Sequence, residues 1–139
     1  MDRQTEYSQF GPAVCVIESD PNMNHQLGKL LAYLDSPILH YMSAESFLAE
    51  SEGIEIGCIL ADGDQLGTQS PEFIDELSQR GLSGATIIIA RHANIDDAVK
   101  ALQRGVADYI EIPQPDRLLL AKIRQVISRG VSASGPRPH

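Results

Sequence analysis

Five short apolar runs, each followed by a stretch with helical spacing, constrain the fold of this sequence more than any other feature. The runs occupy residues 14–17, 37–42, 56–61, 86–90 and 107–111. The fourth, Thr-Ile-Ile-Ile-Ala, has no polar alternation, which is typical of a parallel strand covered on both faces. Five such units in 139 residues predict an α/β fold, a doubly wound five-stranded parallel sheet with helices on both faces.

Residues that are typical of helix ends mark the helices of a single predicted domain. Asp20, Ser43, Asn94 and Asp116 are expected to cap helices. Residues 63–67 are expected to form a loop. We predict a folded domain over residues 13–130, with residues 1–12 and 131–139 as flexible ends or a linker, since the last segment is rich in Ser, Gly and Pro.

The composition indicates a cytoplasmic protein that does not bind nucleic acid directly. The net charge is −8, with residues 1–90 strongly acidic and residues 91–139 carrying an excess of three positive charges. No apolar run approaches the roughly 20 residues of a membrane span, and the N-terminus does not resemble a signal peptide. Cys15 and Cys58 lie in predicted strands and are interpreted as reduced core residues.

Acidic residues follow two of the predicted strands. Asp62 ends the third strand, and Glu18, Ser19 and Asp20 follow the first. The carboxyl ends of parallel strands face one crevice, so these groups suggest a phosphoryl or Mg²⁺ site with Glu18, Asp20 and Asp62 as weak metal ligands. The later strand ends hold Ala90 and Ile112. The sequence therefore supplies only part of the polar groups that such a site needs.

Each of these residues also has a plainer interpretation. Asp62 could be a solvated acid at a loop start, and Asp20 is readily explained as a helix cap. Arg91 either places a counter-charge over the acidic crevice or points into solvent from its loop.

Several motifs in register resemble the receiver domain of bacterial two-component response regulators over residues 13–130. Val-Ile-Glu-Ser-Asp-Pro at 16–21 resembles the first strand and acidic turn of that family, and Cys-Ile-Leu-Ala-Asp at 58–62 resembles the strand that ends in the phosphoacceptor. Residues 92–113 resemble its fourth helix, its Gly-Ala-Asp turn and its fifth strand. The resemblance implies the flavodoxin-like strand order 2-1-3-4-5.

The resemblance also implies roles for individual residues and shows where this sequence departs from the pattern. Asp62 matches the phosphoacceptor and Tyr109 the aromatic switch position. Ser19 stands where an acidic Mg²⁺ ligand is expected. Ala90 stands at the hydroxyl position and Ile112 at the Lys position, which makes both of them degenerate switch positions. Without these groups, phosphoryl transfer is expected to be very slow.

These observations predict an atypical, phosphorylation-independent receiver domain, not an enzyme, that controls an output domain or partner in transcription regulation through protein–protein contacts. We expect no cofactor beyond weak Mg²⁺, and no contact with nucleic acid or membrane. A homodimer is expected through the fourth helix, fifth strand and fifth helix. The residues expected on that face are Lys100, Arg104, Asp108, Glu111, Arg117, Lys122 and Arg124.

Two alternatives remain open at this point. In the first, a histidine kinase or phosphotransfer protein still phosphorylates Asp62 in the presence of Mg²⁺. In the second, the same fold binds flavin or a nucleotide, although no Gly-rich phosphate cradle follows the first strand.

Overall fold

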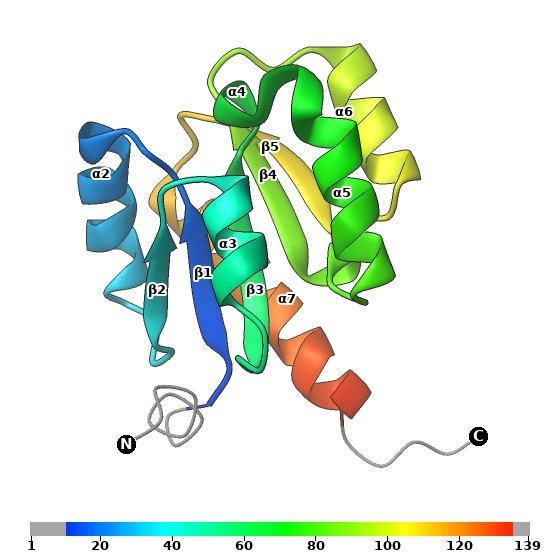
Figure 1. Ribbon diagram of the computed structural model, residues 1–139. Helices are drawn as coiled ribbons and strands as arrows, with labels where there is room; N and C mark the ends of the chain where they lie inside the picture. Colours follow the sequence, from blue (N-terminus) through cyan, green and yellow to red (C-terminus); the bar gives the residue numbers. More distant parts are fainter. Residues whose placement is uncertain (1–10, 135–139) are drawn as a thin grey trace.

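The computed structural model describes residues 11–134, and its central feature is one five-stranded parallel sheet (Figure 1). The strands are β1 (Ala13–Ile17), β2 (Ile38–Tyr41), β3 (Ile56–Asp62), β4 (Thr86–Ala90) and β5 (Asp108–Glu111). Their order is β2-β1-β3-β4-β5, with every neighbouring pair parallel. The predicted fold class and strand order are confirmed.

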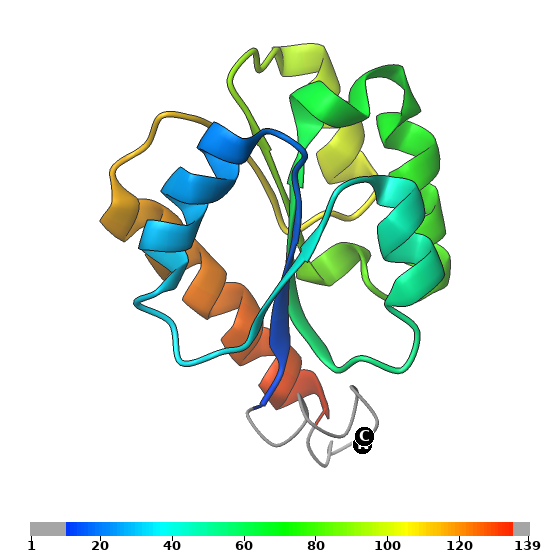
Figure 2. The same cartoon turned by 60° about the vertical axis from the view of Figure 1, so that its left-hand side comes forward.

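Helices cover both faces of the sheet, as Figure 2 shows with the sheet seen nearly edge-on. Helices α2 (Pro21–Leu31) and α7 (Asp116–Ser134) pack on one face. Helices α3 (Ala44–Glu50), α5 (Ser70–Gln79) and α6 (Ile95–Gln103) lie on the other. The short segments α4 (Gly63–Leu66), η1 (Gly67–Gln69) and η2 (Ser83–Ala85) complete the connections.

The strands alternate their side chains between two buried clusters, one on each face of the sheet. Cys15 belongs to the α3/α5 side and Cys58 to the α2/α7 side, so the two free thiols lie on opposite faces although β1 and β3 pair. On the α3/α5 side, the Phe47 ring meets Tyr41 and Phe73 edge-to-face, at centroid distances of 5.2 and 6.2 Å. Burial of this kind supplies most of the stabilisation of such a sheet.

The capping predictions hold for three of the helices. Asp20 Oδ1 accepts from Asn22 N at 3.0 Å, Ser43 Oγ accepts from Ser46 N at 3.0 Å, and Asn94 Oδ1 accepts from Asp97 N at 2.8 Å. Asp116 differs, because it is the first residue of α7 and not a flanking cap.

Two segment predictions are wrong. Residues 63–67 are not an irregular loop, because α4 begins at Gly63 directly after β3, with the Asp62 side chain as its N-cap. Residues 131–134 are not linker either, since α7 continues to Ser134. Residues 1–10 and 135–139, which belong to the other predicted flexible ends, lie outside the described residues.

One helix places its apolar face outward. In α6, Ile95, Val99 and Leu102 are 80%, 44% and 46% exposed, and Ala101 is the buried residue of the helix. Spacings of three and four residues put these three side chains on the same side of the helix. The apolar stripe of α6 is therefore free in the described part of the chain and is not part of the core.

Candidate functional site at the carboxyl ends of the strands

The acidic residues predicted at the strand ends do meet at one edge of the sheet. Glu18 follows β1 and Asp62 ends β3, and these two strands are neighbours. The Glu18 side chain is almost completely buried, with 2% of its surface exposed, and lies close to the carboxyl group of Asp62. Burial, followed by the contact with Asp62, raises the pKa of Glu18 to about 7.

Glu18 has one satisfied and one unsatisfied oxygen. Oε2 accepts from Asp20 N at 3.1 Å, whereas Oε1 has no N–H or O–H donor within residues 11–134. Two ionised carboxylates cannot donate a hydrogen bond to each other. If one of the two groups is protonated, its O–H can donate to the other, which would join Glu18 and Asp62 by a hydrogen bond. The Glu18 and Asp62 carboxyl groups would therefore be stabilised by a bound cation or by a shared proton.

Asp62 is fixed by the helix that it begins. Its Oδ1 atom accepts from Asp64 N at 2.9 Å and from Gln65 N at 3.3 Å. These bonds satisfy two of the free N–H groups at the start of α4. Gly63 between them has no room for a side chain, because an added Cβ would lie 2.8 Å from Ile88 Cγ2.

Gln65 of α4, which the sequence did not single out, connects α4 to the loops that follow β1 and β2. Its Oε1 atom accepts from Ser19 N at 2.8 Å and from Ser19 Oγ at 2.9 Å, and its Nε2 donates to Met42 O at 2.8 Å. The Ser19 hydroxyl, at the position expected to ligate Mg²⁺, is therefore turned toward a carboxamide. A polar residue three positions after the acceptor was the only sequence signal of this contact.

Arg91 lies over the crevice. Its Nη1 atom is 3.7 Å from Asp20 Oδ2, with both side chains partly exposed. The counter-charge interpretation of Arg91 is therefore supported by the geometry, although its partner is Asp20 and not Asp62. Asp20 is both a helix cap and an ion-pair partner, which leaves its carboxylate engaged on two sides.

The two degenerate positions are apolar and contribute to packing. Ala90 is buried with 1% of its surface exposed, and Ile112 packs against the cluster on the α2/α7 face. Neither offers a hydroxyl or an ammonium group to the crevice. The Ile112–Pro113 peptide bond is cis.

The residues present do not fit the Mg²⁺ ion that the family pattern implies. Within the described residues there is no group of three or more His, Cys, Asp and Glu side chains placed to hold a metal ion. The predicted ligand set of Glu18, Asp20 and Asp62 is therefore not assembled, because Asp20 turns to the start of α2 and to Arg91. Glu18 and Asp62 are two carboxylates without a third acidic ligand.

Tyr109 connects the crevice to a neighbouring cavity. It is half-buried on β5 and lines a cavity of about 430 Å³ between α5 and α6. Its hydroxyl lies near Gly63, since a Cβ added there would be 3.5 Å from Tyr109 Oη. Burial, with smaller effects of Asp97, Asp64 and Asp62, raises the pKa of Tyr109.

The residues predicted for a dimer face lie on α6 or directly after it, on β5 and on α7. Lys100 and Arg104 line the cavity between α5 and α6, and Arg104 Nε is 3.3 Å from Asp75 Oδ1 of α5. Lys122 Nζ is 3.2 Å from Asp108 Oδ2, and both line a second cavity with Glu111 and Leu118. Arg117 is exposed near the start of α7.

Arg124 is a predicted face residue whose hydrogen bond lies away from α6 and β5. Its Nη2 donates to Tyr33 O at 3.2 Å, so it lies toward the connection between α2 and β2. The sequence reasoning also left out the exposed apolar side chains of α6 and Leu118 of α7, which is 51% exposed.

The comparisons with known proteins agree with this geometry. The family model of the response regulator receiver domain matches residues 14–124. The chain belongs to the response regulator receiver family. This result confirms the resemblance found in the sequence, and the strand order and crevice position follow the pattern expected from it.

Several curated relatives of this receiver domain are named transcriptional regulatory proteins. It is 31% identical over 116 residues to the transcriptional regulatory protein FixJ of Azorhizobium caulinodans, covering 84% of this chain and 55% of the relative. It is 28% identical over 105 residues to the C4-dicarboxylate transport transcriptional regulatory protein DctR of Rhodobacter capsulatus, covering 74% of this chain and 53% of the relative. The chain thus spans about half the length of the curated relatives it matches.

Solved structures give the same result for this receiver domain. A response regulator receiver protein from Pseudoalteromonas atlantica superposes with a TM-score of 0.76 at 27% identity, over 85% of this chain and 98% of that one. Full-length FixJ from B. japonicum gives a TM-score of 0.78 at 25% identity, over 89% of this chain and 61% of that one. No helix in the described part of the chain is long and apolar enough to cross a membrane.

Proposed function

We propose that this receiver domain transmits signals through protein–protein contacts without phosphoryl transfer to Asp62, and that it controls an output domain or partner protein in transcription regulation. The observation that supports this most directly is the composition of the crevice. Ala90 and Ile112 are packed against the core, and Ser19 is bonded to Gln65.

The chemistry of phosphoryl transfer explains why these departures matter. Catalysis of this reaction depends on fixed groups that position and neutralise the phosphoryl oxygens. A phosphorylated Asp62 would carry about −1.5 to −2 charge at neutral pH beside Glu18, in place of the single negative charge of the free carboxylate. Removing one preorganised stabilising group typically costs about 10²–10³ in rate, so three departures together argue for very slow phosphorylation.

The relatives support a role in transcription regulation. FixJ and DctR are named transcriptional regulatory proteins, and this chain matches about half of each. We therefore propose a cytoplasmic regulator in which the receiver contacts an output region or a partner that binds DNA. The receiver itself, with a net charge of −8, is proposed to be neither an enzyme nor a nucleic-acid-binding module.

The partner surface proposed for the receiver is the outer face of α6, extended by the start of α7. Ile95, Val99, Leu102 and Leu118 expose apolar side chains there. Lys122 and Asp108 form a charged pair between α7 and β5. Apolar residues surrounded by charges of both signs suit a two-fold contact with a second copy of this chain.

A second candidate function is a receiver that still accepts a phosphoryl group from a histidine kinase or phosphotransfer protein on Asp62. The unsatisfied Glu18 Oε1 atom next to Asp62 favours it, because a buried acceptor without a donor would be satisfied by a bound cation. The family match favours either receiver function over a flavin or nucleotide carrier.

One titration separates the two receiver functions. The protein would be titrated with Mg²⁺ and beryllofluoride and followed by NMR, beside the restored variant Ser19→Asp/Ala90→Thr/Ile112→Lys. The proposal expects no saturable shift in the natural sequence up to tens of millimolar Mg²⁺, while the restored variant responds. Saturable shifts in the natural sequence that extend to Tyr109 would contradict it.

The dimer is tested by sedimentation equilibrium. The double variant Val99→Asp/Leu102→Asp places charges on the exposed stripe of α6 and is expected to be monomeric. The matched control is Gln26→Asp/Lys29→Asp on the exposed side of α2, which should leave the association unchanged. A natural sequence that is monomeric at all concentrations would exclude this interface.

A further inference from the structure

Asp64, which no sequence motif identified, connects the start of α4 to the loop between β4 and α6. Its Oδ2 atom accepts from Arg91 N at 2.7 Å. His92 N lies 3.3 Å from Oδ1 and 3.4 Å from Oδ2 of the same carboxylate. Two consecutive backbone N–H groups of one loop are thus directed at a single anionic side chain.

Successive backbone N–H groups that converge in this way form a binding site for an anion. The distance of 2.7 Å between Arg91 N and Asp64 Oδ2 is short, as expected of a hydrogen bond to a charged acceptor. A phosphoryl group would also present strong acceptor oxygens and negative charge at the carboxyl end of this sheet. The site is already occupied by a carboxylate of the chain itself.

The loop that Asp64 holds is restrained on a second side. The Arg91 side chain reaches Asp20 at the other edge of the crevice, while its backbone N–H donates to Asp64. Beneath the loop, Ala90 has only a methyl group and cannot form a hydrogen bond to the crevice. Asp64 and Asp20 are therefore the side chains that fix the position of Arg91.

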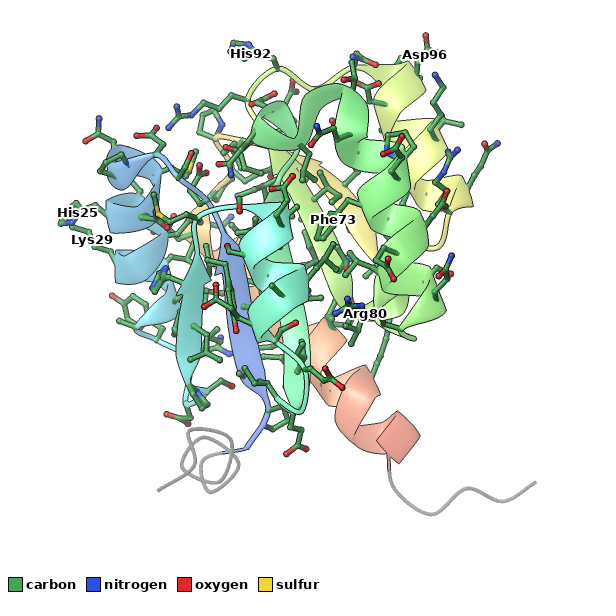
Figure 3. All side chains as sticks on the ribbon, viewed as in Figure 1. His25, Lys29, Phe73, Arg80, His92 and Asp96 are labelled. Atoms are coloured by element: carbon green, nitrogen blue, oxygen red, sulfur yellow. The ribbon has the colours of Figure 1, made fainter. Side chains whose placement is uncertain are left out.

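The restrained loop leads directly into the surface proposed for the partner. In Figure 1 this loop arches over α4 and descends into α6. Figure 3 shows His92 on the loop and Asp96 on the first turn of α6 at the same end of the molecule. Asn94 caps α6, and the exposed Ile95 follows at once. The loop therefore joins the start of α6, where the apolar stripe begins at Ile95.

We propose that the Asp64 carboxylate acts as a resident anion in place of a phosphoryl group. It holds the β4–α6 loop over the crevice at all times, so that the outer face of α6 is presented constitutively to a second copy of the chain. Asp64 is a positioning residue for that surface and does not itself contact the partner. The dimerisation part of this inference rests on the proposed function, whereas the loop restraint does not.

The test compares Asp64→Ala with the control Asp35→Ala, which removes an exposed carboxylate from the α2–β2 connection. Amide hydrogen exchange is measured residue by residue by NMR, together with the shifts of α6 and the dimer dissociation constant. For Asp64→Ala we expect exchange of the Arg91 and His92 amides to rise about tenfold or more, shifts extending through Val99, and about tenfold weaker dimerisation. The control should match the natural sequence.

The results that would overturn the inference are distinct from those that would overturn the proposed function. Unchanged protection of Arg91 and His92 in Asp64→Ala, or shifts that stop before α6, would exclude the loop restraint. Lost protection with dimerisation as tight as in the natural sequence would exclude the positioning role. A natural sequence that never dimerises refutes the proposed interface, and in that case exchange and shifts in the monomer still decide whether Asp64 holds the loop.

Discussion

The hydroxyl of Ser19 donates to the carboxamide oxygen of Gln65 across 2.9 Å, and the backbone N–H of Ser19 donates to the same oxygen across 2.8 Å. In a receiver that uses Mg²⁺, an acidic side chain is expected where Ser19 stands. Here the neutral Gln65 side chain joins α4 to the loop after β1, and its Nε2 atom reaches the loop after β2 at Met42 O. The Gln65 side chain therefore links the segments that follow β1, β2 and β3.

Replacing Gln65 by Ala should loosen these loops without unfolding the domain. Three hydrogen bonds are lost at exposed positions, each worth about 0.5–1.5 kcal/mol at most, and water replaces part of them. We expect a loss of about 1 kcal/mol in the free energy of unfolding and faster exchange of the Ser19 amide. Urea unfolding and hydrogen exchange measure both. Gln79→Ala, at the exposed end of α5, is the control, and equal effects in the two variants would argue against the bridge.

Glu18 should make stability fall as the pH rises. Its pKa is raised to about 7 in the folded protein and lies near 4.5 when unfolded, so the folded state holds the proton more tightly. Its contribution is fully present below about pH 4.5 and is lost as the pH rises through about 7. In Glu18→Gln this pH dependence of the free energy of unfolding should disappear. At pH 8 the free energy of unfolding should be higher than in the natural sequence by on the order of 1–3 kcal/mol. Urea unfolding from pH 4.5 to 8 tests this, and an unchanged slope in the variant would assign the dependence to another group.

Gly63 and Gly28 form a matched pair for testing how tightly the crevice is packed. A Cβ at position 63 would lie 2.8 Å from Ile88 Cγ2, whereas a Cβ at position 28 on α2 meets nothing within 4 Å. Gly63→Ala should therefore lower the free energy of unfolding by about 1–3 kcal/mol and shift the NMR resonances of Tyr109. Gly28→Ala should gain about 0.5–1 kcal/mol, because alanine favours the helix. Thermal unfolding of both variants gives the comparison, and a tolerated Gly63→Ala would show that the turn can move.

Cys15 and Cys58 should be unreactive in the native protein. Both are fully buried, and burial raises the pKa of Cys15 to about 12 and that of Cys58 further still. Their lack of exposure means that modification requires opening of the sheet. We expect a thiol reagent at pH 8 to react at least about 100-fold more slowly with the folded protein than in denaturant. Rapid reaction of one thiol would reveal local opening of β1 or β3.

Much of the fold follows from local patterns in the sequence. The uninterrupted apolar residues of β4 and the caps Asp20 and Asn94 depend only on neighbouring residues, so they predict elements that the structure confirms. The strand ends also determine that Asp62, Ala90 and Ile112 surround one crevice, because parallel strands place their carboxyl ends together. In this way the sequence alone predicted the receiver fold, which the comparisons confirm, and the apolar residues Ala90 and Ile112 at two of its strand ends.

The tertiary structure decided which side chains meet around this crevice. Gln65 meets Ser19 and Met42 at separations of 46 and 23 residues, and Asp64 meets Arg91 at 27, contacts that no local spacing encodes. The outward apolar stripe of α6 and the turn of Arg124 toward Tyr33 likewise depend on how the helices are placed on the sheet. Periodicity reveals that a helix has an apolar side, but only the packed neighbours determine whether that side is buried or left for a partner.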